Sequence, residues 1–168
     1  SGKQQGIGRP RYKRQEKETD DAYGLRLQDA RQQQLHAVAD IASRAVDAAR
    51  KATTLSPRNV DVWSNLGLIY QNLLGAVGGV DEAVINAYIQ SEQLEPKNPV
   101  FPTEIGKTYL FQADTLRKTA DALKDDQQKK DAEAKIADRL GLAVASFNAA
   151  IRLKPDYAKA HCSLGVAL

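Results

Sequence analysis

The chain has 168 residues, 42% of them hydrophobic and 27% charged, with a net charge of +3. This is enough for one domain with a buried core. The single cysteine, Cys162, excludes an internal disulfide framework, and no run of eighteen apolar residues could span a membrane. The nearly balanced charge argues against nucleic-acid binding by the chain as a whole.

The N-terminal residues 1–19 hold six basic and two acidic residues, a net charge of +4 that leaves the remainder near neutral. Glycine or proline at positions 2, 6, 8 and 10 predicts a flexible basic tail. Within it, Gly8-Arg9-Pro10-Arg11 resembles the core of an AT-hook, which lies in a narrow DNA minor groove. DNA binding through the tail is therefore one alternative, although a solvated tail, a linker or a membrane-proximal basic segment is the more ordinary interpretation.

The sequence lacks methionine, even at position 1, and has no apolar segment of a secretory signal near its N-terminus. We therefore expect a processed or cloned fragment, soluble by itself, whose localisation signals lie elsewhere. Its compartment is left open.

The first helix is expected to begin near Thr19 and Asp20, which can cap it. From Leu35 to Ala52 the apolar residues recur with the spacing of one helical face. Residues 26–34 are polar and only weakly periodic. Residues 20–54 therefore form either one long helix or two.

The next two helices are predicted over Val60–Leu74 and Glu82–Leu94, capped by Asn59 and Asp81. Between them lies the glycine-rich segment GAVGGVD. It follows a helix, and no lysine with a following serine or threonine comes after it, so a turn is favoured over a phosphate-binding loop.

Two unusually long helices follow, because apolar positions recur at helical spacing over residues 105–123 and 136–151. Their polar tip, residues 124–131, should protrude beyond the neighbouring hairpin. It lacks the central glycine of a calcium loop. A last helix is expected to begin near Asp156 and to stop at Leu168 in mid-repeat, which leaves an apolar face without its partner helix.

Three segments that begin at Ser56, Glu95 and Lys154 align without gaps. Each has a proline, and nine residues later an aliphatic residue is followed by glycine; these pairs are Leu66-Gly67, Ile105-Gly106 and Leu164-Gly165. The proline ends one helix and directs the chain into the next. The small residues then allow close helix packing, and larger side chains fill the space, namely Trp63, Tyr70, Tyr88, Tyr109 and Phe147.

At these residues the sequence resembles the tetratricopeptide repeat (TPR), a unit of two antiparallel helices. The resemblance covers residues 35–168. It implies an all-α solenoid of helical hairpins, a right-handed superhelix with one elongated, protruding hairpin. We place the repeat domain at residues 20–168, with units at about 20–57, 58–96, 97–155 and a truncated 156–168.

More weakly, GAVGGVDEAVINAYIQSEQLEPKNP, the extended hairpin and KPDYAKAH resemble the C-terminal repeat region of bacterial O-antigen ligase or polymerase-like membrane proteins. This resemblance implies a second alternative, a soluble appendage of a glycan-ligating membrane enzyme. It carries over none of the membrane chemistry.

Catalytic and metal-binding clusters are not found in the sequence. His161 and Cys162 are adjacent, so they point about 100° apart on a helix and do not form a metal pair. We expect both to be packing residues, and we expect no catalytic residue, metal or cofactor.

The TPR resemblance implies a concave groove lined by the first helix of each hairpin. The matching positions are Asp61, Ser64, Asn65, Leu68, Gln71, Asn72, Thr103, Lys107, Leu110 and Phe111. Chaperone-adaptor members of the family hold a peptide carboxylate with lysine and asparagine side chains. Only Asn65 and Lys107 match that set, so a mixed polar and apolar groove for an extended or helical peptide is favoured.

The favoured function is therefore a non-catalytic scaffold that binds protein or peptide. A further partner is a second copy, through the truncated last repeat. The groove residues could alternatively be merely solvated, or covered by a further repeat of a longer chain.

Overall fold

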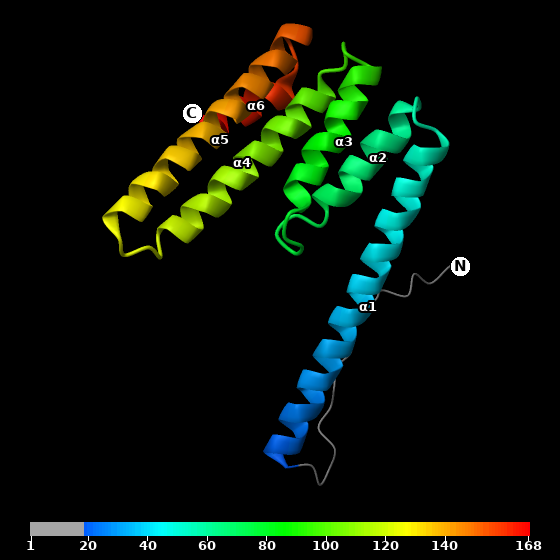
Figure 1. Ribbon diagram of the computed structural model, residues 1–168, viewed down its shortest axis with the longest axis vertical. Helices are drawn as coiled ribbons and strands as arrows, with labels where there is room; N and C mark the ends of the chain where they lie inside the picture. The colour runs from blue at the N-terminus through cyan, green and yellow to red at the C-terminus, as the bar shows by residue number, and fades with distance from the viewer. Residues whose placement is uncertain (1–18) are drawn as a thin grey trace, which may run out of the picture. The chain divides into compact units, whose positions relative to one another are not determined.

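The computed structural model describes residues 19–168, which contain six helices and no strands (Figure 1). The predicted all-α fold of helical hairpins is confirmed. The predicted flexible tail, apart from Thr19, and the AT-hook-like segment lie outside the described residues. The chain divides into two compact units, Ser1–Ser43 and Arg44–Leu168.

The first helix, α1 (Asp20–Leu55), is one continuous helix of 36 residues. Thr19 caps it as expected, because its Oγ1 accepts a hydrogen bond from the Ala22 amide at 3.3 Å. Asp20 and Asp21 place negative charge at the positive end of the helix dipole. Its part within the first unit exposes several large apolar side chains, namely Leu25, Leu35, Val38 and Ile41.

The first hairpin pairs α2 (Val60–Gln71) with α3 (Val80–Leu94). Asn59 caps α2 as predicted, accepting from the Asp61 amide at 2.9 Å, and α2 ends three residues earlier than expected. The prediction that Asp81 caps α3 is wrong. Gly79, at φ +74°, occupies the N-cap in the left-handed region, so α3 begins before Asp81 and needs no side-chain cap.

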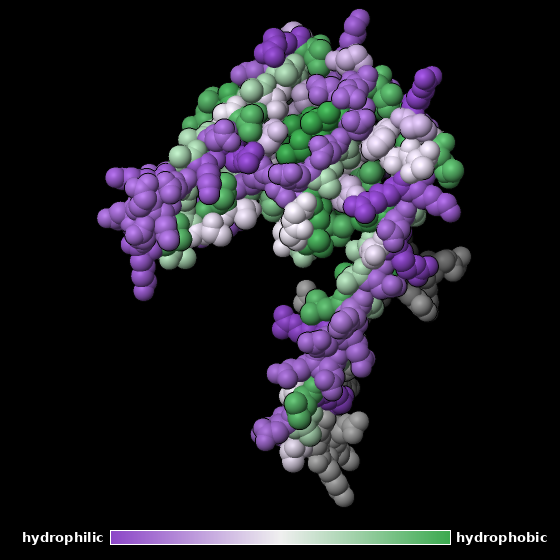
Figure 2. Space-filling view, viewed as in Figure 1, coloured by the Kyte–Doolittle hydropathy of each residue, from purple (hydrophilic) through white to green (hydrophobic). Residues whose placement is uncertain are grey.

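The second hairpin pairs α4 (Val100–Ala120) with α5 (Asp126–Leu153), so the extra residues lengthen both helices. Most of the predicted tip belongs to α5, which begins at Asp126 because Asp125 caps it, accepting from the Gln128 amide at 2.8 Å. The end of α4 and the start of α5, which meet at the turn of this hairpin, reach beyond α3 (Figure 1). Hydrophilic side chains gather there (Figure 2). The last helix is α6 (Ala158–Ala167).

The core forms where an aromatic side chain of one helix meets a glycine of its partner. A Cβ atom at Gly67 would lie 2.9 Å from the Tyr88 ring, and one at Gly106 would lie 2.6 Å from the Phe147 ring. Tyr88 and Phe147 are both buried and both lie eight residues before a proline. The two hairpins therefore use the same close contact.

The third glycine of the pattern, Gly165, has nothing within 4 Å of an added Cβ. Among residues 19–168 no aromatic ring contacts this position. The expectation of an uncovered α6 face is consistent with this, since Val166 is 68% exposed.

In the repeats that begin at Ser56 and Lys154, an aromatic ring also bonds to the carbonyl of the proline turn. The Trp63 indole N–H donates to the Pro57 carbonyl at 2.9 Å. His161, six residues after Pro155, places Nε2 2.7 Å from the Pro155 carbonyl. His161 therefore takes the place of the tryptophan. Trp63 is partly buried and packs against the core, as expected, whereas His161 is exposed, which corrects the expectation that it packs inside.

Candidate functional site

The predicted groove residues of α2 lie on its accessible side. Asp61, Asn65 and Leu68 are exposed, and Ser64 is half-buried. Asn72 follows the last residue of α2, and its side-chain amide donates to the Leu68 carbonyl at 3.0 Å. The amide of Asn72 is thus engaged in ending the helix.

Thr103, the predicted groove residue nearest the start of α4, is fully buried. Its hydroxyl donates to the Pro99 carbonyl at 2.7 Å, so this small side chain enters the core with its hydrogen-bonding group satisfied. Thr103 therefore does not line a groove. The equivalent position in α2, Ser64, is only half-buried, so one repeat position has two environments.

A polar bridge joins α2, α3 and α4 at the middle of the predicted groove. The Tyr88 hydroxyl donates to Gln71 Oε1 at 2.8 Å, and Gln71 Nε2 donates to Glu104 Oε2 at 2.8 Å. Lys107 Nζ donates to Glu104 Oε1 at 2.7 Å. Because Lys107 neutralises Glu104, the bridge brings no net charge to the groove.

The Tyr88 hydroxyl is the titratable group most affected by this bridge. Burial raises the pKa of Tyr88 well above its ordinary value of 10.0, and the negative charge of Glu104 raises it further. Tyr88 is therefore held as a neutral hydrogen-bond donor. Glu104 also lies at a position of α4 that the repeat resemblance assigns to the groove, and its spacing of three from Lys107 places the two side chains on one helix face.

Beyond the bridge, α4 and the end of α6 enclose a pocket of about 430 Å³, the α4–α6 pocket. Three predicted residues meet here, namely Lys107, Leu110 and Phe111. The sequence did not indicate the other side chains of the wall, because they come from α5, α6 and the extended half of α4. These are Ala113, Asp114, Arg117, Leu140, Val166, Ala167 and Leu168.

The rim of the α4–α6 pocket carries charge of both signs. Lys107 and Arg117 are cationic, and Asp114 is the one carboxylate side chain among the residues that line it. A hydrogen bond from Lys118, at 2.7 Å, lowers the pKa of Asp114 below its ordinary range. Since Lys118 neutralises Asp114 and Lys107 pairs with Glu104, the uncompensated charge at the rim is the positive charge of Arg117.

Metal chemistry has no candidate site in the described part of the chain, where no group of three or more histidine, cysteine, aspartate or glutamate residues could hold an ion. None of the helices within residues 19–168 is long and apolar enough to cross a bilayer. Cys162 is exposed, which corrects the expectation that it packs in the core.

A family model described as a TPR repeat matches residues 138–168. The matched stretch comprises the second half of α5, the turn at Pro155 and α6. A comparison with curated protein sequences finds no match. The likeness to O-antigen ligase repeat regions is not shown by these findings.

The matched repeat agrees with the geometry of the rest of the chain. The glycine–aromatic contacts of α2 with α3 and of α4 with α5 repeat one packing rule, and the rings of Trp63 and His161 bond to the same kind of proline turn. Residues 138–168 therefore match a TPR repeat, and the hairpins of α2 with α3 and of α4 with α5 are similar to it in their packing.

Proposed function

We propose that this chain is a scaffold that binds a protein segment in the α4–α6 pocket. TPR repeats generally mediate protein–protein interaction, and proteins built from them are typically non-catalytic. The finer assignment to this pocket and its residues is our proposal. We also propose the repeat boundaries predicted above, with units at about 20–57, 58–96, 97–155 and 156–168.

The observation that carries the proposal is the chemistry of the pocket itself. Its wall is apolar at Leu110, Phe111, Leu140 and Val166. A volume of about 430 Å³ accommodates one or two side chains of a peptide. These features favour an extended or helical segment with an exposed apolar anchor.

The charge at the rim specifies the residue beside the anchor. Lys107 keeps 40% of its side-chain surface exposed although it pairs with Glu104, and Arg117 is exposed. A carboxylate next to the anchor would meet both cations. We therefore propose an acidic-apolar segment as the ligand.

The test uses matched, end-capped nonapeptides with a central Leu-Glu, Leu-Gln or Leu-Lys pair in a glycine-serine background, titrated by fluorescence anisotropy. We expect the Leu-Glu peptide to bind best. Replacing both cations, Lys107→Gln with Arg117→Gln, should weaken its binding by about fivefold to tenfold.

The control variant is Lys135→Gln, which removes an exposed charge from α5 outside the pocket and should leave binding unchanged. Equal binding of the three peptides, or an equal loss in the control, would contradict the proposal. Circular dichroism of each variant establishes that the helices are retained.

A further inference from the structure

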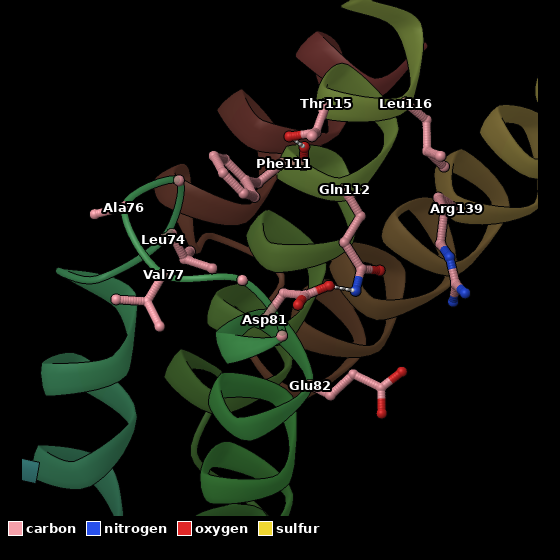
Figure 3. Close-up of a pocket in the computed structure, with 13 residues that line it drawn as sticks. Leu74, Ala76, Val77, Asp81, Glu82, Phe111, Gln112, Thr115, Leu116 and Arg139 are labelled. Carbon is pink, nitrogen blue, oxygen red and sulfur yellow. Dashed lines mark hydrogen bonds between the residues drawn. The ribbon is translucent and has the colours of Figure 1, made fainter. Parts of the chain in front are cut away.

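A second recess, of about 470 Å³, lies where the short first hairpin meets the long second one (Figure 3). We call it the loop recess. It is bounded by the α2–α3 connection, the start of α3, the middle of α4 and one side chain of α5. It shares Phe111, and no other residue, with the α4–α6 pocket.

The loop recess exists because the two hairpins differ in length. The helices α2 and α3 have 12 and 15 residues, whereas α4 and α5 have 21 and 28. The α2–α3 connection therefore ends against the side of α4. Gly75, at φ +78°, sets the direction of this connection, and an added Cβ would lie 3.6 Å from the Phe111 ring.

The walls nearest the connection are apolar. Leu74 and Val77 come from the connection, and Phe111 and Leu116 come from α4 (Figure 3). The Val77 side chain is 49% exposed. The backbone conformation of the connection does not require a branched apolar residue at this position. Such a recess favours one apolar side chain of a ligand.

The floor of the loop recess is acidic. Asp81 and Glu82 occupy the first turn of α3, and Asp81 accepts a hydrogen bond from the Gln112 side-chain amide (Figure 3). The carbonyl oxygen of that amide is buried and has no hydrogen-bond partner in the described structure. Glu82 is exposed and has no ion-pair partner among residues 19–168. Arg139 of α5 is the one cation of the lining.

We propose that the loop recess binds a peptide segment in which an apolar residue is followed by lysine or arginine. The apolar side chain fills the space between Val77, Phe111 and Leu116. The neighbouring cation pairs with Glu82, and Arg139 donates to a main-chain carbonyl of the segment. The carboxylates outnumber the single cation, so the preferred charge is opposite to that of the α4–α6 pocket.

The test titrates the ¹⁵N-labelled chain with three end-capped nonapeptides, which contain a central Phe-Lys, Phe-Glu or Ser-Lys pair in a glycine-serine background. The Phe-Lys peptide should shift the amide signals of Val77, Gly79 and Gln112. The Phe-Glu and Ser-Lys peptides should each bind about fivefold more weakly.

Two variants separate the charged and the apolar contributions. Glu82→Gln should abolish the preference for Phe-Lys over Phe-Glu, and Val77→Ser should weaken binding of both Phe peptides. Glu133→Gln removes a matched, exposed carboxylate from α5 and should change neither. Shifts confined to other residues, no shift at millimolar peptide, or an unchanged preference in Glu82→Gln would overturn the proposal.

The α4–α6 pocket is tested separately in the same titration. The Lys107→Gln, Arg117→Gln double variant should leave Phe-Lys binding at the loop recess unchanged. The two proposals can therefore fail independently, because they involve opposite charge preferences and different amide signals.

Discussion

At the scale of single residues, the two glycine–aromatic contacts determine how closely the helices pack. At both Gly67 and Gly106 an added methyl group would overlap an aromatic ring that is buried on its other side. The remaining helical glycines, at 24, 141 and 165, have open space around the Cβ position. The same residue type is therefore a packing requirement at two sites and a weak point of the helix at three others.

We expect Gly106→Ala to lower the free energy of unfolding by about 1–3 kcal/mol, because the Phe147 ring must move to admit the methyl group. Gly67→Ala should act in the same direction against Tyr88. Gly141→Ala, in the interior of α5, should instead raise stability by up to about 1 kcal/mol through helix propensity.

Urea denaturation followed by circular dichroism measures these changes. Gly141→Ala serves as the control for the substitution itself. Stability that rises equally in all three variants would contradict the glycine–aromatic packing.

The Tyr88 hydroxyl gives a pH dependence with a definite sign. Its pKa is raised in the folded chain, so the folded state keeps the proton at a pH at which the unfolded tyrosine, with a pKa near 10, loses it. Stability from this group is complete below pH 10 and is lost as the pH rises above 10. The loss is at most about 1.4 kcal/mol per pH unit.

Replacing this group, Tyr88→Phe, should remove that part of the loss. We expect the variant to be less stable than wild type at pH 8, because Gln71 loses its hydrogen bond, and its stability to fall less steeply between pH 10 and 11. Parallel pH profiles of the two proteins in urea denaturation would show that Tyr88 titrates normally.

At the scale of the helices, local sequence signals predicted where a helix begins better than they predicted which side chains surround a given residue in the fold. Thr19 and Asn59 cap their helices as expected, because a cap depends on neighbours two or three residues away. Asp81 is not the N-cap of α3, because Gly79 occupies that position in a left-handed conformation. The side chains of the sequence give no hydrogen-bonding pattern that indicates this conformation. Periodicity likewise could not decide whether α1 continues through the polar residues 26–34 or breaks there into two helices.

The candidate site shows the same division. Lys107, Leu110 and Phe111 share one face of α4, and the TPR resemblance predicted that they line one groove. Leu140 joins them from a helix whose register against α4 is set by tertiary packing. Thr103 was misplaced for the same reason, since only the contact between helices distinguishes it from Ser64.

The cap at Asp125 determines where the elongated hairpin turns. We expect Asp125→Ala to destabilise the start of α5 by about 1 kcal/mol, because the Gln128 amide loses its acceptor. Hydrogen exchange should become faster over residues 126–131 and stay unchanged near Phe147. Asp121→Ala removes a second exposed carboxylate from the same turn as a control, and equal effects of the two substitutions would contradict the capping role.

At the scale of the whole second unit, the core consists of two clusters of buried side chains. One is centred on Leu66, Ile85 and Tyr88, and the other on Ala143 and Phe147. In repeat proteins, stability is approximately a sum of units and of contacts between neighbours. Substitutions in different clusters should therefore act independently.

We expect the destabilisation by Ile85→Val and by Leu164→Ala to add within about 0.5 kcal/mol in the double variant. Ile85 belongs to the first cluster, and Leu164 packs against the second. Urea denaturation of the four proteins measures the coupling. A coupling above about 1 kcal/mol would show that the two clusters behave as one core.

The hydrogen bond from the indole of Trp63 to the Pro57 carbonyl gives this chain an internal optical reporter. Trp63 is the only tryptophan in the sequence, so its fluorescence records the solvation of the first hairpin alone, whereas far-ultraviolet dichroism averages over every helix. If the two spectroscopic melting curves superimpose, the hairpins are lost together. If they separate, the repeats unfold in steps, and the fluorescence curve gives the temperature at which the first hairpin unfolds.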